Sequence, residues 1–148
     1  MVVPLFALLL CIVAVQSAKQ SFSPHVDNGG TVVGLAGKDY VLFAADTRLK
    51  NEYAIHTRNI TRLFEIADGL LFTGAYCWTD VLALSKELKN EATVYEWEHR
   101  MKLALRPFSY LVASKLYKRR MFPYYTFPIV AGIDSEGVYI HNGLAFLF

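Results

Sequence analysis

The hydrophobic and polar positions before residue 74 form short runs separated by turn residues. Four runs precede the first helical pattern: 31–35, 40–45, 62–67 and 70–73. The first two flank a turn at 36–39, and the last two flank Asp68 and Gly69. Short β-rich runs joined by such turns are typical of β-hairpins. The pattern predicts two hairpins, with the strand 40–45 buried on both faces and the strand 70–73 closed by Gly74.

After Gly74 the apolar residues recur at spacings of three and four, which indicates amphipathic helices. Thr79 is a suitable N-cap for a first helix that ends near Met101. Pro107 suits the first turn of a second helix that continues to Arg120. The chain thus has a helical pair between two β-rich parts.

Two more strands, 128–133 and 138–141, follow around a turn at 134–137. Runs of strands and helices in this order predict an α+β fold with antiparallel sheets. The composition agrees with one globular domain, since 148 residues carry 54% apolar and 19% charged side chains. It excludes a disordered tail, a collagen-like rod and a disulfide scaffold.

The first 18 residues form an apolar leader. Leu5 to Val15 is an unbroken apolar run of 11 residues, which matches the core of a signal peptide and is too short to span a bilayer. Val15 and Ser17 suit a signal-peptidase site, but no Lys or Arg precedes the run. Residues 1–18 are therefore either a signal-like segment or a leader on a protein that is never secreted.

The cysteines and the glycosylation sequon do not decide between these readings. Cys11 lies inside the leader, so a processed chain keeps only Cys77 and forms no internal disulfide. Asn59 fits the sequon, but a chance match is the favoured interpretation.

A basic stretch runs through residues 100–120, and an aromatic cluster follows at 121–127. Nucleic-acid binding needs a stronger positive balance than the net charge of +2 of the whole chain, so a solvated or subunit-facing helix is the favoured interpretation. The aromatic cluster is expected to fill core and subunit contacts. No nucleic-acid partner is expected.

Other sites of chemistry are not indicated. The four histidines lack metal-ligand spacing, and the chain has neither a phosphate loop nor a G-x-S-x-G motif. We expect no metal and no cofactor. The histidines are His25, His56, His99 and His141.

Two motifs resemble those of a known family. Asn28-Gly29-Gly30-Thr31, followed by Ala44-Ala45-Asp46-Thr47-Arg48, is similar to the β-subunits of the 20S proteasome, which are N-terminal-nucleophile hydrolases. The resemblance covers about residues 21–141. Further segments narrow it to a single type of β-subunit: 22–24, 55–58, 119–125 and 132–137.

The resemblance implies a fold, partners and a location. The fold would be a four-layer αββα sandwich formed by residues 30–148, with residues 19–29 as the remnant of a pro-segment. The family's chain continues beyond the point near Asn142 where the resemblance fades, so the sandwich is expected to be incomplete at its C-terminus. The partners would be other proteasome α- and β-subunits in a particle of the cytoplasm and nucleus. No membrane contact is expected unless the leader is retained.

The same resemblance locates a degenerate catalytic site. In catalytic members a threonine becomes the first residue, an aspartate follows it by 16 residues, and a lysine follows by 16 more. With Asp46 as the aspartate, the nucleophile position is Gly30 and the lysine position is Arg62. Glycine has no nucleophilic side-chain oxygen, and an arginine, which does not readily give up its proton, is no proton relay. We expect a non-catalytic subunit, in which Asp46 accepts backbone N–H bonds.

Two alternatives remain. An active threonine protease would have to use Thr31, whose side chain is expected on the opposite face of the strand from Asp46. Lys50 offers no replacement lysine, because it follows Asp46 by only four residues. The second alternative is a secreted or membrane-tethered relic of the family with a binding role, which would enter the secretory pathway through residues 1–18.

Overall fold

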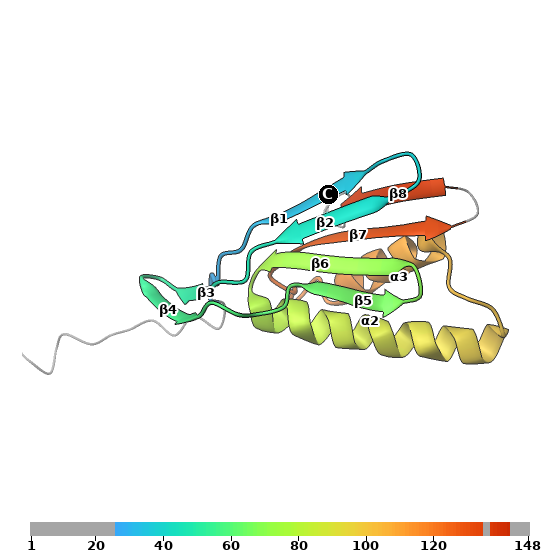
Figure 1. The fold of residues 1–148 in the computed structure, drawn as a ribbon. Coiled ribbons are helices and arrows are strands. Elements are labelled where there is room, and N and C mark those ends of the chain that lie inside the picture. Colours follow the sequence, from blue (N-terminus) through green and yellow to red (C-terminus); the bar gives the residue numbers. More distant parts are fainter. Residues whose placement is uncertain (1–25, 135–136, 143–148) are drawn as a thin grey trace, which may run out of the picture.

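The computed structural model describes residues 26–134 and 137–142, which form eight strands and two helices (Figure 1). Three hairpins come first: β1 (Val32–Ala36) with β2 (Val41–Ala45), β3 (Leu49–Asn51) with β4 (Ala54–Thr57), and β5 (Leu63–Ala67) with β6 (Leu70–Tyr76). The helices α2 (Trp78–His99) and α3 (Leu105–Lys118) follow, and then the strands β7 (Thr126–Asp134) and β8 (Gly137–Asn142).

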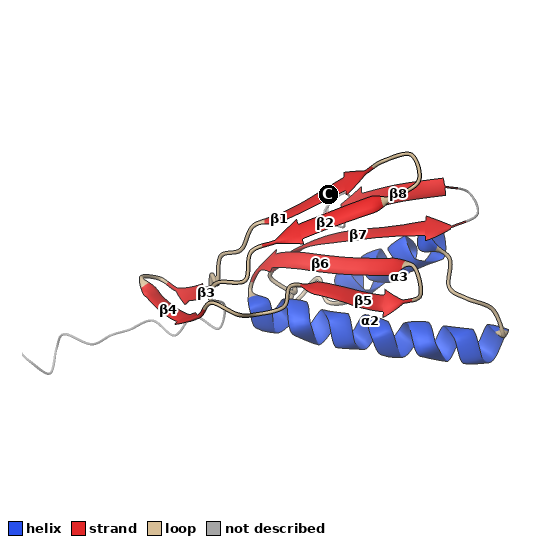
Figure 2. Ribbon diagram, viewed as in Figure 1, coloured by secondary structure: helices blue, strands red, loops and turns tan. Residues whose placement is uncertain are grey.

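The described elements form three layers. A four-stranded antiparallel sheet has the order β5-β6-β7-β8, and both helices pack on one of its faces (Figure 2). The β1–β2 hairpin crosses the opposite face, where it contacts all four strands. This arrangement confirms the predicted α+β class with antiparallel sheets, and it is consistent with the predicted sandwich.

The main core lies between the sheet and the helices. Phe72 and Val130 point from the sheet toward Leu84, Leu88 and Phe108, and all five are fully buried or nearly so. Each such side chain stabilises the fold by about 1.5–3 kcal/mol relative to an exposed one. The apolar spacing seen in the sequence is thus the face that holds the helices on the sheet.

A polar cluster joins the two helices to the chain that leads into β7. Lys115 Nζ donates to Glu87 Oε1 at 2.9 Å and to Glu91 Oε1 at 2.5 Å. The Tyr124 hydroxyl donates to Glu87 Oε2 at 3.0 Å. The Lys115 hydrogen bond holds the pKa of Glu87 below its usual value, and the two glutamates raise the pKa of Lys115. Charge-assisted bonds of this kind are stronger than neutral ones.

The sequence analysis missed one hairpin and was wrong about the burial of one strand. The β3–β4 hairpin was not predicted, because its short strands contain Lys50, Asn51 and His56 and give no apolar run. The second strand is not buried on both faces. Leu42 in β2 and Val33 in β1 are both exposed, since no described element packs on the outer face of this hairpin.

The ends of several elements also differ from the prediction. The α2 helix starts at Trp78 with Cys77 at the N-cap, because Asn28 Oδ1 accepts the backbone N–H of Trp78 at 3.0 Å and replaces the expected cap by Thr79. The β6 strand passes through Gly74 and ends at Tyr76, since β7 pairs with it along its whole length.

The second helix begins before its proline. Pro107 is the third residue of α3, where the first turn still needs no N–H donor from it. The helix ends at Lys118, two residues before the predicted end. The first helix likewise ends at His99, before Met101.

Several sequence expectations fall outside the described part of the chain. The leader, Cys11, the sequence-based cleavage site and residues 143–148 all do so. Within the described residues, no helix is long and apolar enough to cross a membrane. Cys77 is a free, buried thiol and Asn59 is exposed.

Candidate functional site

The segment before β1 is held in place by hydrogen bonds to distant parts of the chain. The Asn28 N–H donates to the Tyr76 carbonyl at 3.2 Å, and the Tyr76 N–H donates to the Gly29 carbonyl at 3.0 Å. The Asn28 side chain donates to the Lys50 carbonyl at 3.0 Å and accepts from the Trp78 N–H. This segment therefore joins β3, the end of β6 and the start of α2.

Two consecutive glycines, Gly29 and Gly30, lie in the segment that these hydrogen bonds hold in place. Gly29 has φ 67° and Gly30 has φ 109°, conformations that residues with a side chain rarely adopt. The Gly29 N–H donates to the Asp27 carboxylate at 2.7 Å. The backbone conformation at Gly29 and Gly30 therefore favours glycine over any residue with a side chain.

Asp46 lies at the end of β2, directly beside this segment. Its Oδ1 accepts the Thr31 N–H at 3.2 Å and the Arg62 Nε–H at 3.1 Å. Its own N–H donates to the Thr31 carbonyl at 3.0 Å. The expectation that Asp46 accepts a backbone N–H at the strand end is confirmed.

Arg62 is the buried charge of the site. It is 1% exposed, and its Nη2 donates to the Arg48 carbonyl at 3.0 Å. Its Nη1 is buried with no hydrogen-bond partner among the described residues, while its carbonyl accepts the Thr73 hydroxyl at 2.8 Å. Two hydrogen bonds, to Asp46 and Arg48, therefore fix the guanidinium.

The fixed guanidinium occupies the space beside Gly30. A Cβ placed on Gly30 would lie 2.8 Å from Arg62 Cζ and 2.9 Å from Arg62 Nη1, closer than real Cβ atoms approach other heavy atoms. The three positions located by spacing, Gly30, Asp46 and Arg62, are thus brought together. No side chain fits at position 30 unless Arg62 moves.

Thr31 and Lys50, considered above as replacements for the missing nucleophile and lysine, lie in different surroundings. Thr31 is exposed, and its contacts with Asp46 are made by its backbone. Lys50 is close to the site despite its short separation from Asp46, because its Cε lies 2.7 Å from where a Cβ on Gly29 would be. Its Nζ is 3.9 Å from the Asp27 carboxylate. Lys50 thus lies beside the residue before Gly30.

Sequence reasoning missed the roles of Asn28 and Lys50. Both act through the β3 strand, which carries no apolar pattern and was not predicted. The only sequence signal was the presence of Asn28 in the quoted motif. Across residues 26–134 and 137–142, no group of three His, Cys, Asp or Glu side chains could hold a metal ion.

Comparisons with known proteins give a consistent result. The family described as "Proteasome subunit" matches residues 26–142. Proteasome subunit beta type-1 of Drosophila melanogaster is 40% identical over 116 residues, which are 78% of this chain and 49% of that protein. The same-named protein of Arabidopsis thaliana is 37% identical over 117 residues, 79% of this chain and 52% of that protein.

One relative, from Schizosaccharomyces pombe, is named as a β-subunit of a different type number. The "Probable proteasome subunit beta type-6" of that organism is 38% identical over 120 residues, 81% of this chain and 53% of that protein. The chain therefore spans about half the length of the curated relatives that it matches.

Proposed function

Since the chain belongs to the proteasome subunit family, we propose that it is a non-catalytic β-subunit of the 20S core particle, of the kind named beta type-1. Its role is to complete a ring of homologous subunits. In the assembled particle, other subunits hydrolyse the peptides, and this chain does not. The partners are other α- and β-subunits, and the location is the cytoplasm and nucleus.

The arrangement of Gly30 and Arg62 carries the non-catalytic part of the proposal. Acyl transfer by this family requires a nucleophilic oxygen at the position of Gly30, and glycine has none. The neighbouring residue is an arginine, and a guanidinium is not suited to the proton transfer that a lysine amine can perform. It also fills the space that a nucleophilic side chain would need.

The exposed apolar surface of the β1–β2 hairpin supports the assembly part. Val33, Leu35 and Leu42 are each more than half exposed on its outer face. A contiguous apolar surface of this kind is typical of a surface that is covered in an assembly. Inside a particle this surface would be buried, either by the fourth layer of the expected sandwich or by a neighbouring subunit.

The two alternatives make different predictions. A protease that used Thr31 would need cleavage before this residue, which frees its amine to act as the base, and a hydroxyl that faces Asp46. Both Asp46 contacts instead go to the Thr31 backbone. A secreted relic would begin near Ala18 and would carry a glycan on Asn59. Sequencing of the mature N-terminus separates the secreted relic from a cytosolic subunit.

The test of assembly is to express the full chain with a C-terminal tag in eukaryotic cells and to purify 20S particles through a different subunit. We expect the tagged chain to co-sediment with the particle in amounts comparable to those of the other β-subunits. Consistent recovery outside the particle, or from the culture medium, would contradict the proposal. An abundant cytosolic protein with the same tag measures carry-over.

A further inference from the structure

Asn28 and Gly29 are a pair of neighbouring residues with a chemistry of their own. An asparagine followed by a glycine is prone to deamidation, because glycine has no side chain to keep its backbone nitrogen away from the asparagine amide. The pair lies before β1, outside any strand or helix, and Asn28 is only half-buried. Since the reaction needs water and no other molecule, the conformation of this segment decides whether it occurs.

The deamidation of Asn28 has two steps. In the first, the Gly29 nitrogen forms a bond to Asn28 Cγ, the bond from Cγ to Nδ2 breaks, and ammonia leaves with the proton of the Gly29 N–H. This step closes a succinimide ring. In the second, water adds to one of the ring carbonyls and opens the ring. The product is either aspartate or isoaspartate at position 28.

In the folded chain, hydrogen bonds hold the Asn28 side chain away from this reaction. Its Nδ2 donates to the Lys50 carbonyl at 3.0 Å, and its Oδ1 accepts the Trp78 N–H at 3.0 Å. The side chain therefore reaches out to β3 and α2, whereas in the ring it would fold back on its own backbone. Backbone hydrogen bonds to Tyr76 hold the same segment. We call this set of hydrogen bonds the clamp.

The clamp depends on less buried groups than the core does. Lys50 and Trp78 are both half-buried, and the adjoining hydrogen bond from the Gly29 N–H to Asp27 is exposed. In contrast, α2 is held on the sheet by fully buried side chains such as Leu84. Segments held by partly exposed hydrogen bonds open locally at a lower free energy than the core. We therefore expect the clamp to open while the helices stay on the sheet.

The product of the reaction cannot close the clamp again. An aspartate at position 28 has no N–H group to donate to the Lys50 carbonyl, so two acceptor oxygens would face each other. Isoaspartate also inserts a methylene group into the main chain before Gly29. This insertion displaces Gly30 from its place beside Arg62. An opening that ends in reaction is therefore permanent.

We propose that Asn28 is a site of deamidation controlled by the conformation of the chain. The clamp keeps the side chain intact while it is closed, and opening converts Asn28 irreversibly to aspartate or isoaspartate. The modified fraction then records how long a population of the chain has been open. The inference goes beyond the proposed function, because it requires neither a ring nor a partner.

The test measures deamidation of the purified full chain at neutral pH, in buffer and in urea. Incubation in heavy-oxygen water labels only the products formed during the experiment, and peptide mass spectrometry measures each site. We expect the rate at Asn28 to be at least about tenfold lower in the folded chain, which corresponds to about 1.4 kcal/mol from the hydrogen bonds that must break. In urea, Asn142, which also precedes a glycine, should react at a similar rate.

The substitution Trp78→Pro tests the clamp without changing Asn28 or Gly29. It removes the backbone N–H that Asn28 Oδ1 accepts, and proline is tolerated at the first position of a helix, which Trp78 occupies in α2. The matched variant Trp78→Ala removes the same side chain and keeps the N–H. In the folded chain we expect Trp78→Pro to raise the rate at Asn28 about fivefold over Trp78→Ala.

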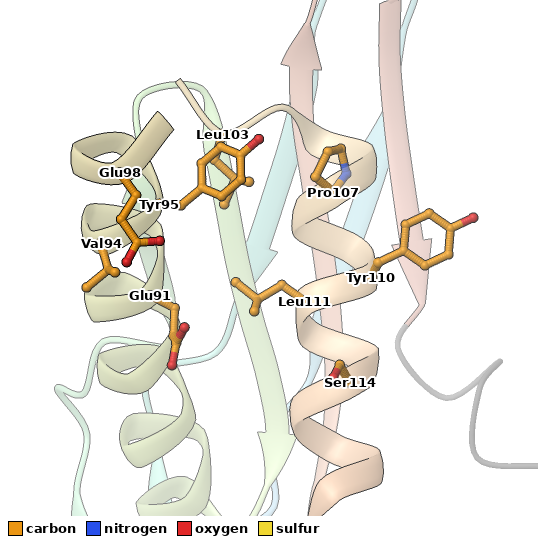
Figure 3. Close-up of a pocket in the computed structure, with 9 residues that line it drawn as sticks. All are labelled: Glu91, Val94, Tyr95, Glu98, Leu103, Pro107, Tyr110, Leu111 and Ser114. Atoms are coloured by element: carbon orange, nitrogen blue, oxygen red, sulfur yellow. The ribbon is translucent and has the colours of Figure 1, made fainter. Parts of the chain in front are cut away.

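A third variant controls for changes elsewhere in α2. The clamp lies at the N-terminal end of this helix, whereas the groove between α2 and α3 in Figure 3 lies along its C-terminal half. Val94 lines that groove and is 49% exposed. Val94→Ser should therefore leave the rate at Asn28 unchanged within about twofold. Circular dichroism shows whether each variant is folded.

Three results would overturn the inference. They are equal rates at Asn28 in buffer and in urea, equal rates for folded Trp78→Pro and Trp78→Ala, and an Asn28 that stays intact in urea while Asn142 reacts. If Trp78→Pro does not fold, the comparison of buffer with urea decides. Failure of the proposed function is a separate result, since these rates are measured on the chain outside any particle.

Discussion

Gly30 is the position at which the structure makes its sharpest energetic prediction. A Gly30→Ala substitution adds a single methyl group where the backbone has φ 109° and where the Arg62 guanidinium already fills the space. Two separate costs follow, one from the backbone and one from the collision. Each can be measured with its own reference variant.

The two costs have different sizes. A non-glycine residue in a sparsely populated conformation costs about 1–3 kcal/mol. Relief of the 2.8 Å approach requires Arg62 to move, which weakens its bonds to Asp46 and to the Arg48 carbonyl. Hydrogen bonds to charged groups are each worth about 1.5–3 kcal/mol. We therefore expect Gly30→Ala to lower the free energy of unfolding by about 3–5 kcal/mol.

Gly69→Ala is the matched control for the backbone cost. Gly69 has φ 78°, and among the described residues a Cβ there would meet only the Ile133 carbonyl oxygen, at an ordinary 3.4 Å. This variant should lose about 1–3 kcal/mol. The difference between the two alanine variants then measures the collision with Arg62.

The assay is urea unfolding of the full chain followed by circular dichroism, with a double-mutant cycle. In an Arg62→Lys background the planar guanidinium is absent, so Gly30→Ala should cost at least about 1.5 kcal/mol less than in the unmodified chain. If the two changes add within about 0.5 kcal/mol, the residues do not interact and the account of the site is wrong. Equal costs for Gly30→Ala and Gly69→Ala would refute it as well.

Three further predictions concern the links between the helices and the rest of the fold. Lys115→Met should lower the free energy of unfolding by about 1–3 kcal/mol in urea titrations, because it leaves Glu87 without its main partner, whereas Lys89→Met at an exposed site should change it by less than about 0.5 kcal/mol. Lys115 lowers the pKa of Glu87, so the contribution of Glu87 to the free energy of unfolding is complete above the ordinary carboxyl pKa of 4.5 and is lost as the pH falls through the pKa of the folded state. When the urea midpoint is measured against pH, Lys115→Met should therefore remove this loss of stability at acid pH. Asn28→Ala should cost about 1–2 kcal/mol and should raise amide hydrogen exchange at Trp78, because the α2 N-terminus loses its long-range cap; unchanged exchange would contradict this role.

The sequence located three positions, Gly30, Asp46 and Arg62, that lie together in the structure, but it did not predict their surroundings. The spacing of Gly30, Asp46 and Arg62 brings them together because the strand ends that carry them pack side by side. It could not show that the guanidinium would fill the space beside Gly30, since that depends on the Arg48 carbonyl. Lys50 was excluded as a replacement lysine because it follows Asp46 by only four residues. This sequence separation gave no indication that its side chain lies beside Gly29.

The missed features share a physical cause, since they depend on contacts between distant residues. The cap of α2 comes from Asn28, 50 residues before Trp78, so local propensity pointed to Thr79 instead. The β3–β4 hairpin lacks an apolar run because most of its residues are exposed. The apolar run 40–45 indicated burial on both faces, whereas the structure leaves Leu42 exposed.

The most direct test of a non-catalytic ring subunit is to treat purified 20S particles that contain the full chain with a threonine-reactive active-site probe. Quantitative mass spectrometry then gives both the amount of the chain per particle and the residues that carry the probe. We predict that the chain is present in amounts similar to those of the other β-subunits, that those with a threonine nucleophile are labelled, and that this chain carries no probe. A probe on Thr31, or particles that consistently lack the chain, would contradict the account.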